Sequence, residues 1–525
     1  MSAAADAGNP AQSGAQEGDW GENANPLTLL AILFSLAIAN FMALLDTSIA
    51  NVALPHITGS LGATPHEGTS VITFFAVAEA VTIPLTGWLA KRFGSVRVFL
   101  ASMAGFGLTS AMCGLATSLP MLIGVRVLQG LAAGPMMPLS QSLLTQIMPK
   151  KYYPVAISLW TMTVVIAPIT GPLLGGNIAD SIGWEWAFYI NLPPTIIALF
   201  FGWRLLMPHE TPTKKEPVDF VGLALLILWV GALQIVLDTG AQRGWFEDPM
   251  VFAIGAIGVV GFLSFLIWEL TAEHPIVDLT IFRHPSFTAA CVVMSLSMGA
   301  FYASVLLVPL WLQTDLGYTG SWAGNLMAFN GVLGLIMSPI VGFMLTRVDG
   351  RLISFIGLCG ISIMLFARTF FTDDMQFSQM LPVHLLHGAF MPMFFVPLVA
   401  IALSQVPKPE LPSASGFFAF SRTLAGAIGA SVAATMWTNS TERMHAELSA
   451  EVSNGGADAV AQLQALGLPY DQALARFDQI VNHAAVMLAT NHVFSVVAPV
   501  ILCTGFLLWL TPKPDMHKRP AGGGH

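Results

Sequence analysis

Fourteen long apolar segments occupy most of this 525-residue chain, and each can cross a lipid bilayer as a helix, which takes about 20 residues. Inside a bilayer every backbone polar group has to be paired within the protein, so only helices and closed barrels can span it. Barrel strands are shorter and alternate apolar with polar residues, and this chain lacks that alternation. The sequence therefore predicts an all-α polytopic membrane protein. The segments run over residues 28–54, 68–90, 95–117, 119–147, 154–180, 186–206, 218–238, 249–270, 285–312, 319–346, 351–371, 377–404, 411–438 and 489–511.

The basic residues between the segments predict the orientation of the chain. With the N-terminus in the cytoplasm, the outer loops hold only Arg243, Arg443 and Arg476, and the other loop lysines and arginines are on the inner side. Membrane proteins carry this excess of positive charge on their cytoplasmic loops. We therefore expect both termini in the cytoplasm, with a disordered tail at residues 1–26 and a second tail at 512–525. The first of these tails lacks the basic start of a cleavable signal.

Three motifs recur at nearly equal spacing along the chain. Gly87 returns as Gly342, 255 residues later, in the same position after an apolar segment. RVLQG, which starts at Arg126, returns 258 residues later as HLLHG, and TGPLLGG, which starts at Thr170, has a weaker echo 255 residues later. Parallel repeats of this kind build transporters whose two halves rock about a central site. The repeat predicts two six-helix bundles at 27–207 and 277–511, joined by a linker at 208–276 that adds two transmembrane helices.

Arg126 stands inside the apolar segment 119–147. A charge at membrane depth costs at least ~2.5–3.5 kcal/mol, so this arginine needs a partner or a wet cavity. Asp46 and Glu79 lie in the first and second segments of the same half. Burial raises a carboxyl pKa and a nearby arginine lowers it, which is the balance that proton relays use. We predict that these three residues couple transport to protons. The alternatives are an arginine that only pins helices together, and an Asp46 that pairs locally with Thr47 or Asn51.

Two histidines and one arginine in the second half are also candidates. His384 and His387 correspond in the repeat to Arg126 and Gln129. Histidine titrates near neutral pH, so the pair predicts a possible proton path, and the alternative is a pair of satisfied interior histidines. Arg422 lies toward the inner end of its segment, and we expect it to extend to the cytoplasmic surface.

Aromatic and methionine side chains in the segments predict an apolar substrate. Such surfaces adapt to many molecular shapes without fixed hydrogen bonds. In any membrane protein most of these side chains contact lipid or core, which is the alternative for each. The candidate substrate-binding residues, two polar ones included, are Phe41, Met42, Gln129, Trp160, Phe329, Asn330, Phe417 and Phe420.

Several classes of function are excluded by what the sequence lacks. It has no G-x-x-x-x-G-K-[ST] loop, and only 10% of its residues are charged, which leaves no soluble domain for an ATPase. The basic residues are explained by topology, so we expect no nucleic-acid partner. The four cysteines lie apart in apolar segments, and no ligand cluster or activated nucleophile is present. We expect no enzyme activity, no metal site and no cofactor.

Four motifs resemble the fourteen-span drug:proton antiporters of the major facilitator superfamily, and among them the EmrB-type multidrug exporters. They are LDTSIANVALP at 45–55, RVLQGLAAG at 126–134, APITGPLLGG at 167–176 and GWEWAFYINLPP at 183–194. The resemblance implies the major facilitator fold and covers the whole membrane region. It makes Gly171, Pro172, Gly175 and Gly176 an antiporter motif, whose bent, smooth helix is expected to contact the other half and prevent leak. It also makes the loop after the second segment a gating loop, with Gly87, Lys91, Arg92, Gly94 and Arg97.

The chain departs from the family pattern at a few positions. The gating loop has Lys91 where an aspartate is usual, which puts its charge relay in question, although the EmrB branch shares the lysine. In the antiporter motif Ser158 and Ala167 replace two glycines, and both are still small. Glu185 replaces the usual arginine, and we have no explanation for this change.

The resemblance implies proton-coupled efflux of hydrophobic toxic compounds by alternating access in a bacterial inner membrane. It also implies a periplasmic membrane-fusion adaptor and an outer-membrane channel as partners. The polar outer loop at 439–488 contains an amphipathic stretch, 458–481, broken at Gly467, and we expect either a mobile loop or a docking hairpin. The alternatives are a stand-alone exporter of one metabolite or siderophore, and a membrane sensor that transports nothing.

Overall fold

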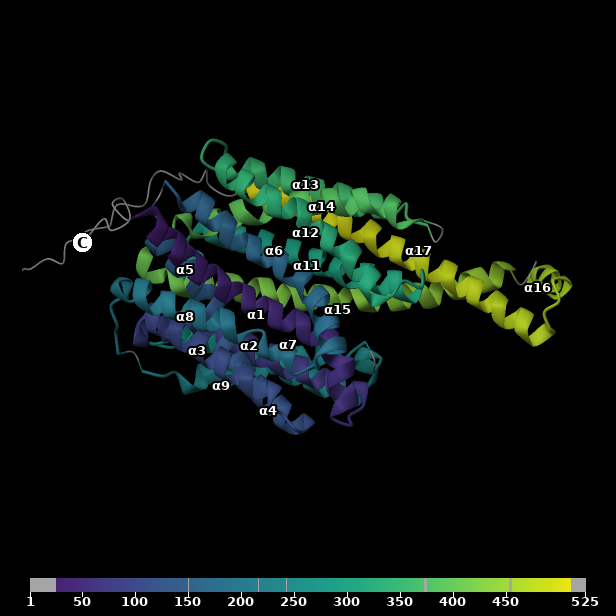
Figure 1. Ribbon diagram of the computed structural model, residues 1–525, viewed down its shortest axis with the longest axis horizontal. Coiled ribbons are helices and arrows are strands. Elements are labelled where there is room, and N and C mark those ends of the chain that lie inside the picture. The colour runs from purple at the N-terminus through teal and green to yellow at the C-terminus, as the bar shows by residue number, and fades with distance from the viewer. Residues whose placement is uncertain are drawn as a thin grey trace, which may run out of the picture.

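A computed structural model describes residues 25–149, 151–215, 217–241, 243–372, 375–452 and 456–510, and all regular structure within these ranges is helical (Figure 1). Thirteen of the described helices are long and apolar enough to cross a membrane. The 29-residue helix α6, Tyr153–Ser181, brings the number of spans to fourteen. The predicted all-α, fourteen-span architecture is confirmed. The tails predicted at 1–26 and 512–525 lie, except for residues 25 and 26, outside the described residues.

Two spans of the first half are broken into two helices each. The fourth breaks at Gly134-Pro135 and the sixth at Ile190-Asn191. The first-half helices are α1 Pro26–Ser60, α2 Pro65–Phe93, α3 Ser95–Gly114, α4 Leu119–Ala133, α5 Met136–Ile147, α6, α7 Trp186–Tyr189 and α8 Leu192–Leu206, followed by the 3-10 helix η1 Met207–His209. The inserted helices are α9 Phe220–Thr239 and α10 Pro249–Thr271, with η2 Trp245–Glu247 between them. The second half comprises η3 Leu279–Arg283, α11 Pro285–Thr314, α12 Gly320–Met344, α13 Gly350–Arg368, α14 Phe377–Ser404, η4 Lys408–Glu410, α15 Leu411–Val452, α16 Gly456–Ala465, α17 Tyr470–Leu507 and η5 Leu508–Leu510.

Side chains at the helix ends fix where these helices begin. Thr64 and Glu67 form a reciprocal capping box at the start of α2, in which each side chain satisfies a backbone N–H of the other residue. Asp219 caps α9 by accepting from the Gly222 N–H, and Asp248 caps α10 by accepting from Met250. Because backbone donors at a helix start have no partner inside the helix, these caps end each loop at a defined residue.

The repeat seen in the sequence is a repeat of helix contacts. Gly87 in α2 packs so tightly against Ser413 of α15 that a Cβ would collide with it, and Gly342 in α12 meets Ser158 of α6 in the same way. These two contacts join the halves at their predicted cytoplasmic ends. Glycine at both positions lets two helix backbones approach closely where any side chain would hold them apart.

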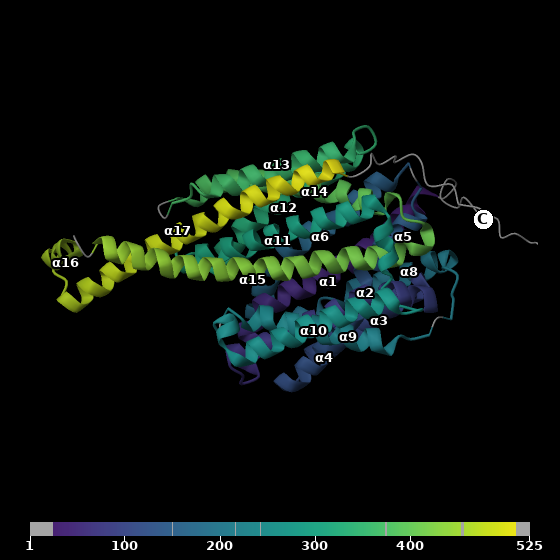
Figure 2. The ribbon, with the colours of Figure 1, turned by 180° about the vertical axis from the view of Figure 1, so that it is seen from behind.

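The inserted helices α9 and α10 cover the side where α2 and α15 meet (Figure 2). Thr73 of α2 donates to Asp238 at the end of α9, and Ser431 of α15 donates to the Leu237 carbonyl. Trp229 of α9 packs edge-on against Phe420 of α15, with ring centroids 5.9 Å apart. The pair therefore contacts both halves at once.

The described residues of the segment 439–488 are largely helical, so that of the two alternatives, a mobile loop and a hairpin, the structure shows a hairpin. Helix α15 runs on for 42 residues and α17 for 38, and together with α16 they extend well beyond the other helices as a narrow hairpin (Figure 1). The amphipathic stretch breaks where expected, with Gly467 at φ +96° and Pro469 before α17. His483 lies 2.6 Å from Asp315 at the end of α11, which attaches the base of the hairpin to the bundle.

Candidate functional site

Asp46 of α1 and Arg126 of α4 form an ion pair inside the first half. Arg126 Nη1 lies 2.5 Å from Asp46 Oδ2, and neither side chain has any exposed surface. The second carboxylate oxygen of Asp46 accepts from Gln129 Nε2 at 3.1 Å and from Asn191 Nδ2 at 2.8 Å. Charge-assisted bonds of this kind are about twice as strong as neutral ones. The sequence prediction that Arg126 and Asp46 meet therefore agrees with the geometry.

The guanidinium of Arg126 has further partners that hold it in place. It donates to Gln129 Oε1 at 2.8 Å and to the Val71 carbonyl of α2 at 3.4 Å. Its central carbon lies 3.9 Å from the ring centroid of Phe75, within the range of a cation–π contact. A buried charge is tolerated in a membrane protein when it is paired and hydrogen-bonded in this way.

Asn191 belongs to this cluster and was missed in the sequence. It stands at the start of α8, where it also donates to Ser110 of α3 at 3.0 Å. Ser110 in turn donates to the Phe188 carbonyl. One feature of the sequence could have revealed it. Asn191 is a polar amide at the start of an apolar segment, shortly before two prolines, and it lies in the motif GWEWAFYINLPP that we used only for its family likeness.

The local alternative for Asp46 is wrong. Thr47 donates to the Ala43 carbonyl of its own helix, and Asn51 has an exposed side chain. Thr47 and Asn51 lie about 100° and about 140° around the helix axis from Asp46, and therefore on another face of α1. The carboxylate therefore bonds between helices and has no partner at Thr47 or Asn51.

Glu79 of α2 does not join the hydrogen-bonded cluster. Its side chain is partly exposed and lies within Coulombic range of Arg422 in α15 and of Arg126 in α4. Arg422 itself is buried, with Nη2 2.7 Å from the Met137 sulfur of α5. The expectation that Arg422 extends to the cytoplasmic surface is wrong, because α15 packs against α5 and encloses the guanidinium between the halves.

The corresponding place in the second half holds a different set of polar groups. His384 and His387 of α14 are buried, and Arg368 at the end of α13 is fully enclosed. His384 Nδ1 lies 3.0 Å from the Met380 carbonyl of its own helix. Gly388 of α14 packs on the Asn330 backbone of α12, as Gly130 of α4 packs on α2. The repeat thus preserves the helix contact and changes the charges beside it.

Comparison with known proteins identifies the family to which this chain belongs. Residues 36–430 match the family model of the Major Facilitator Superfamily, which is more than half of the chain. The chain belongs to the major facilitator superfamily. The multidrug export protein EmrB of Escherichia coli K12 is 39% identical over 501 residues, which are 95% of this chain and 98% of EmrB. The fatty acid resistance protein FarB of Neisseria gonorrhoeae is 38% identical over 497 residues, 94% of this chain and 97% of FarB.

A solved structure supports the same assignment. The human organic anion transporter MFSD10 matches this fold with a TM-score of 0.59 at 14% sequence identity, over 92% of this chain and 98% of that one. At this identity the likeness shows the fold alone. The relatives and the fold together confirm the resemblance that the sequence motifs indicated, and they make the chain a multi-pass membrane protein of this superfamily.

The loop between α2 and α3, predicted from the resemblance to be a gating loop, is stabilised by acidic residues from elsewhere in the chain. Lys91 Nζ lies 3.3 Å from Asp278, which follows the inserted helices. Burial raises the pKa of Asp278, but hydrogen bonds from Thr280 and the charge of Lys91 outweigh it and hold that pKa below its usual range. The basic residue that replaces the usual aspartate is therefore paired with a carboxylate across the linker.

Glu210 is the second acidic residue at this loop. Its carboxylate accepts from the backbone N–H groups of Val96 at 3.0 Å and Arg97 at 2.9 Å, so it caps α3. A Cβ at Gly94 would lie 2.5 Å from the same carboxylate, and Gly94 has φ +95°. Only glycine meets both conditions, which explains its place between α2 and α3.

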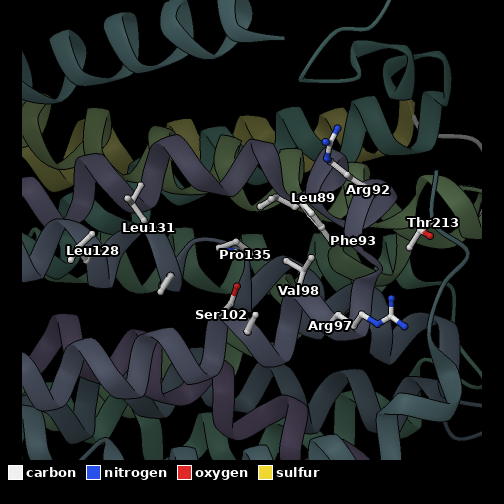
Figure 3. Close-up of a pocket in the computed structure, with 12 residues that line it drawn as sticks. Leu89, Arg92, Phe93, Arg97, Val98, Ser102, Leu128, Leu131, Pro135 and Thr213 are labelled. Carbon is white, nitrogen blue, oxygen red and sulfur yellow. The ribbon is translucent and has the colours of Figure 1, made fainter. Parts of the chain in front are cut away.

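A groove of about 750 Å³ opens beside the loop, between α2, α3 and α4. Arg92 and Arg97 stand at one end of it, and Leu128 and Leu131 line the other (Figure 3). Arg97 lies 3.7 Å from Glu210, and Arg92 covers the Trp88 ring. None of the residues that line the groove belongs to the Asp46 cluster.

The helix that carries the antiporter motif, α6, contacts the other half through α12 and α14, but two of its glycines face α1. Gly171 packs on Ser48 and Gly175 on Ile49, both in α1 of the same half, so the expected contact of these two glycines with the other half is wrong. Spacing reveals a smooth helix face but does not identify the helix that packs on it. The surroundings of Pro172 and Gly176 lie outside the described part of the structure.

The candidate substrate residues divide into two groups. Gln129 lies in the Asp46 cluster, and Met42, Trp160 and Phe420 are buried in helix contacts, with Trp160 donating to Ser140 at 3.0 Å. In this conformation these four have no surface to offer a substrate. The others retain exposed surface and remain candidates; they are Phe41, Phe329, Asn330 and Phe417.

Proposed function

We propose that this chain is a proton-coupled multidrug efflux transporter of a bacterial inner membrane, with both termini in the cytoplasm. The observation that carries the proposal is the Asp46–Arg126 pair, a fully buried carboxylate and guanidinium between helices. Multidrug export is the activity in the printed name of the relative EmrB, which spans nearly the whole chain. The partly exposed aromatic residues fit hydrophobic substrates of varied shape.

Protonation of Asp46 would change every contact in the cluster. A proton on Oδ2 removes the negative charge that holds Arg126, and it leaves Gln129 and Asn191 donating to a neutral group. Hydrogen bonds to a neutral acceptor are about half as strong as those to an ion. The helices α1, α4 and α8 are then less tightly joined, so the protonated and ionised forms favour different helix arrangements.

Glu79 gives the proton a second position between the halves. Its carboxylate is partly exposed and acts on Arg422 in α15 as well as on Arg126 in α4. A proton or a cationic substrate at Glu79 would remove the attraction between α2 and α15. His384 and His387 remain a possible proton path in the second half, without a hydrogen bond that links them to Glu79.

Alternating access would separate the close glycine contacts. Gly87 against Ser413 and Gly342 against Ser158 hold the halves together at one end of the helices. Uptake of a substrate from the cytoplasmic end requires these contacts to part, and release on the other side requires them to form again. The loop pair Lys91–Asp278 adjoins the first of these contacts and would stabilise the closed arrangement.

The helical hairpin fits the role of a contact for partners outside the membrane. It comprises the end of α15, α16 and the start of α17, and it extends beyond the bundles (Figure 1). We propose that a periplasmic membrane-fusion adaptor binds it and leads to an outer-membrane channel, which makes the chain the inner-membrane part of a tripartite pump.

Transport in proteoliposomes after a pH jump tests the proposed coupling. Uptake of ethidium into vesicles with inverted protein should follow the proton gradient in the wild type, and it should lose most of that dependence in Asp46→Asn, Glu79→Gln and Arg126→Ala. Asp238→Asn is the matched control, because Asp238 is a carboxylate at the end of α9, outside the cluster. Full proton dependence in all three variants would rule out the proposed residues.

A further inference from the structure

Arg368 is a buried charge with no carboxylate partner among the described residues. It ends α13 with none of its surface exposed, and Nη1 donates to Ser304 of α11. Its Nε and Nη2 have no hydrogen-bond partner among the described residues. No acidic side chain in the described ranges acts on it. The nearby Phe494 ring, 5.8 Å from the guanidinium carbon, supplies no counter-charge.

The neighbouring histidine adds donor capacity to the same place. His387 has two buried ring nitrogens, and neither has a partner in the described part of the chain. Phe301 stacks on the imidazole with ring centroids 6.0 Å apart, which fixes the plane of its N–H. His387 lies within Coulombic range of Arg368. His384 lies close to the same pair, but its Nδ1 donates to the Met380 carbonyl of its own helix, which fixes the ring and leaves the neutral imidazole no further donor.

A buried arginine that served packing alone would be a poor choice of residue. Breaking up a buried ion pair by leaving one charge alone is strongly destabilising, while apolar side chains of similar size fill the same space at no such cost. Three donor nitrogens therefore lack an acceptor among the described residues: Arg368 Nε, Arg368 Nη2 and one ring nitrogen of His387. An acceptor with a negative charge would satisfy all three. A guanidinium is weakly hydrated and favours anions that take two hydrogen bonds or fit between its donors.

We propose that Arg368, His387 and Ser304 form a binding site for one monovalent anion in the second half, either a chloride ion or the carboxylate group of an amphipathic solute. The anion accepts from Arg368 Nε and Nη2 and from one ring nitrogen of His387. It restores charge neutrality to a part of the bundle that holds a lone positive charge. The site is independent of proton coupling at Asp46 and of the proposed export function.

Thermal unfolding of the full chain in phosphatidylcholine nanodiscs tests the site, because this lipid carries no net charge. Tryptophan fluorescence reports the unfolding temperature while sodium chloride replaces sodium methanesulfonate at constant ionic strength. A second series adds sodium octanoate, with octanol as the uncharged control. An anion that binds only the folded protein raises the unfolding temperature in a saturable way.

We expect the unfolding temperature of the wild type to rise with anion concentration and then to saturate. Arg368→Gln should abolish this rise, and Ser304→Ala and His387→Leu should shift it to several-fold higher anion concentration. Arg204→Gln, an exposed arginine in α8, is the matched control and should respond as the wild type does. Without a binding anion Arg368→Gln should be as stable as the wild type or more so, and with the anion the order should reverse. That reversal separates a binding site from an arginine that only supports the fold.

The two series distinguish the sources of the anion. A response to chloride identifies the free ion, and a response to octanoate without one to chloride or octanol identifies a solute carboxylate. No saturable response in the wild type to either salt, or an equal response in Arg368→Gln, would overturn the proposal. If Arg368→Gln does not fold, unchanged anion affinity in both Ser304→Ala and His387→Leu would overturn it.

Discussion

The two halves of this transporter share close glycine contacts between corresponding helices, but they differ in whether a buried arginine has a carboxylate partner among the described residues. In the first half Arg126 is neutralised by Asp46, and Gln129 and Asn191 complete the bonding. In the second half Arg368 bonds Ser304 and has no carboxylate partner among the described residues, where the histidines that replace Arg126 and Gln129 also leave ring nitrogens without partners. A repeat therefore preserves close contacts between backbones, while its side-chain chemistry diverges wherever packing does not constrain it.

The largest difference between the halves should appear when each arginine is replaced by leucine, beginning with Arg126. Arg126→Leu leaves the Asp46 carboxylate buried without its counter-charge, and we expect a loss of about 3–5 kcal/mol in the free energy of unfolding. Unfolding by denaturant in lipid micelles measures it. The double variant Asp46→Leu with Arg126→Leu should recover part of this loss, and a single variant as stable as the wild type would contradict the pairing.

In a buffer without a binding anion, Arg368→Leu should change the free energy of unfolding in the opposite direction from Arg126→Leu. Removing a buried charge that has no partner relieves its desolvation cost, so we expect between no change and a gain of about 1–4 kcal/mol. The same denaturant titration measures it beside Arg126→Leu. A loss as large as that of Arg126→Leu would show that the two arginines are equivalent and would end the contrast between the halves.

Glycine variants test the packing that the halves share. A Cβ at Gly388 would collide with the Asn330 backbone, and a Cβ at Gly130 would collide with the Phe75 carbonyl. Overpacking of this kind costs about 1–3 kcal/mol, and we expect such a loss for alanine at either position. Gly124→Ala in α4 is the control, because nothing lies within 4 Å of its added Cβ. A loss in one half alone would show that the repeat contacts are not equivalent.

The smallest expected effect distinguishes the inner loops of the halves. Lys91 of the first half pairs with Asp278, whose pKa is lowered, whereas Arg351 of the second half pairs with Asp349 of its own loop. A lowered folded-state pKa gives stability that is present above the usual aspartate pKa of about 3.9 and is lost as the pH falls through the lower folded value. A partly exposed pair contributes about 0.2–1 kcal/mol.

Asp278→Asn should therefore lower the unfolding temperature slightly at pH 7, and the difference from the wild type should shrink as the pH falls below 4. Thermal unfolding measured across this pH range shows the trend. The matched variant Asp349→Asn changes a capping residue within one loop and provides the comparison for a local effect. A difference for Asp278→Asn that grows at acid pH would reverse the sign expected for this pair.

The sequence predicted the spans well because apolar length is a property of each segment by itself. It also predicted that Asp46 meets Arg126, since a buried charge requires a partner in the same half. Asn191 was missed because an amide carries no charge and hydropathy does not mark it. The burial of Arg422 was missed because position along a helix gives depth and does not reveal which helix covers that face.

The hairpin at 439–488 was one of two alternatives that the sequence left open, the other being a mobile loop. Its polar residues in 439–488 suggested a loop, since a membrane helix was expected to end where the apolar residues end. The helices α15 and α17 continue through that point because their two polar faces support each other outside the bilayer, as in the pair His445–Asp478 at 3.2 Å. Composition indicates where a helix leaves the membrane and does not indicate where it stops.

Because α15 runs without a break from the second bundle into the hairpin, the two are joined by one rigid helix. With 42 residues in one helix, α15 is about 63 Å long from its first turn to its last. A tilt of the bundle by ten degrees would swing the far end of such a rod sideways by about 11 Å. If the halves rock as proposed, a small tilt inside the bilayer would become a large sweep outside it, which a spin label at the tip would report.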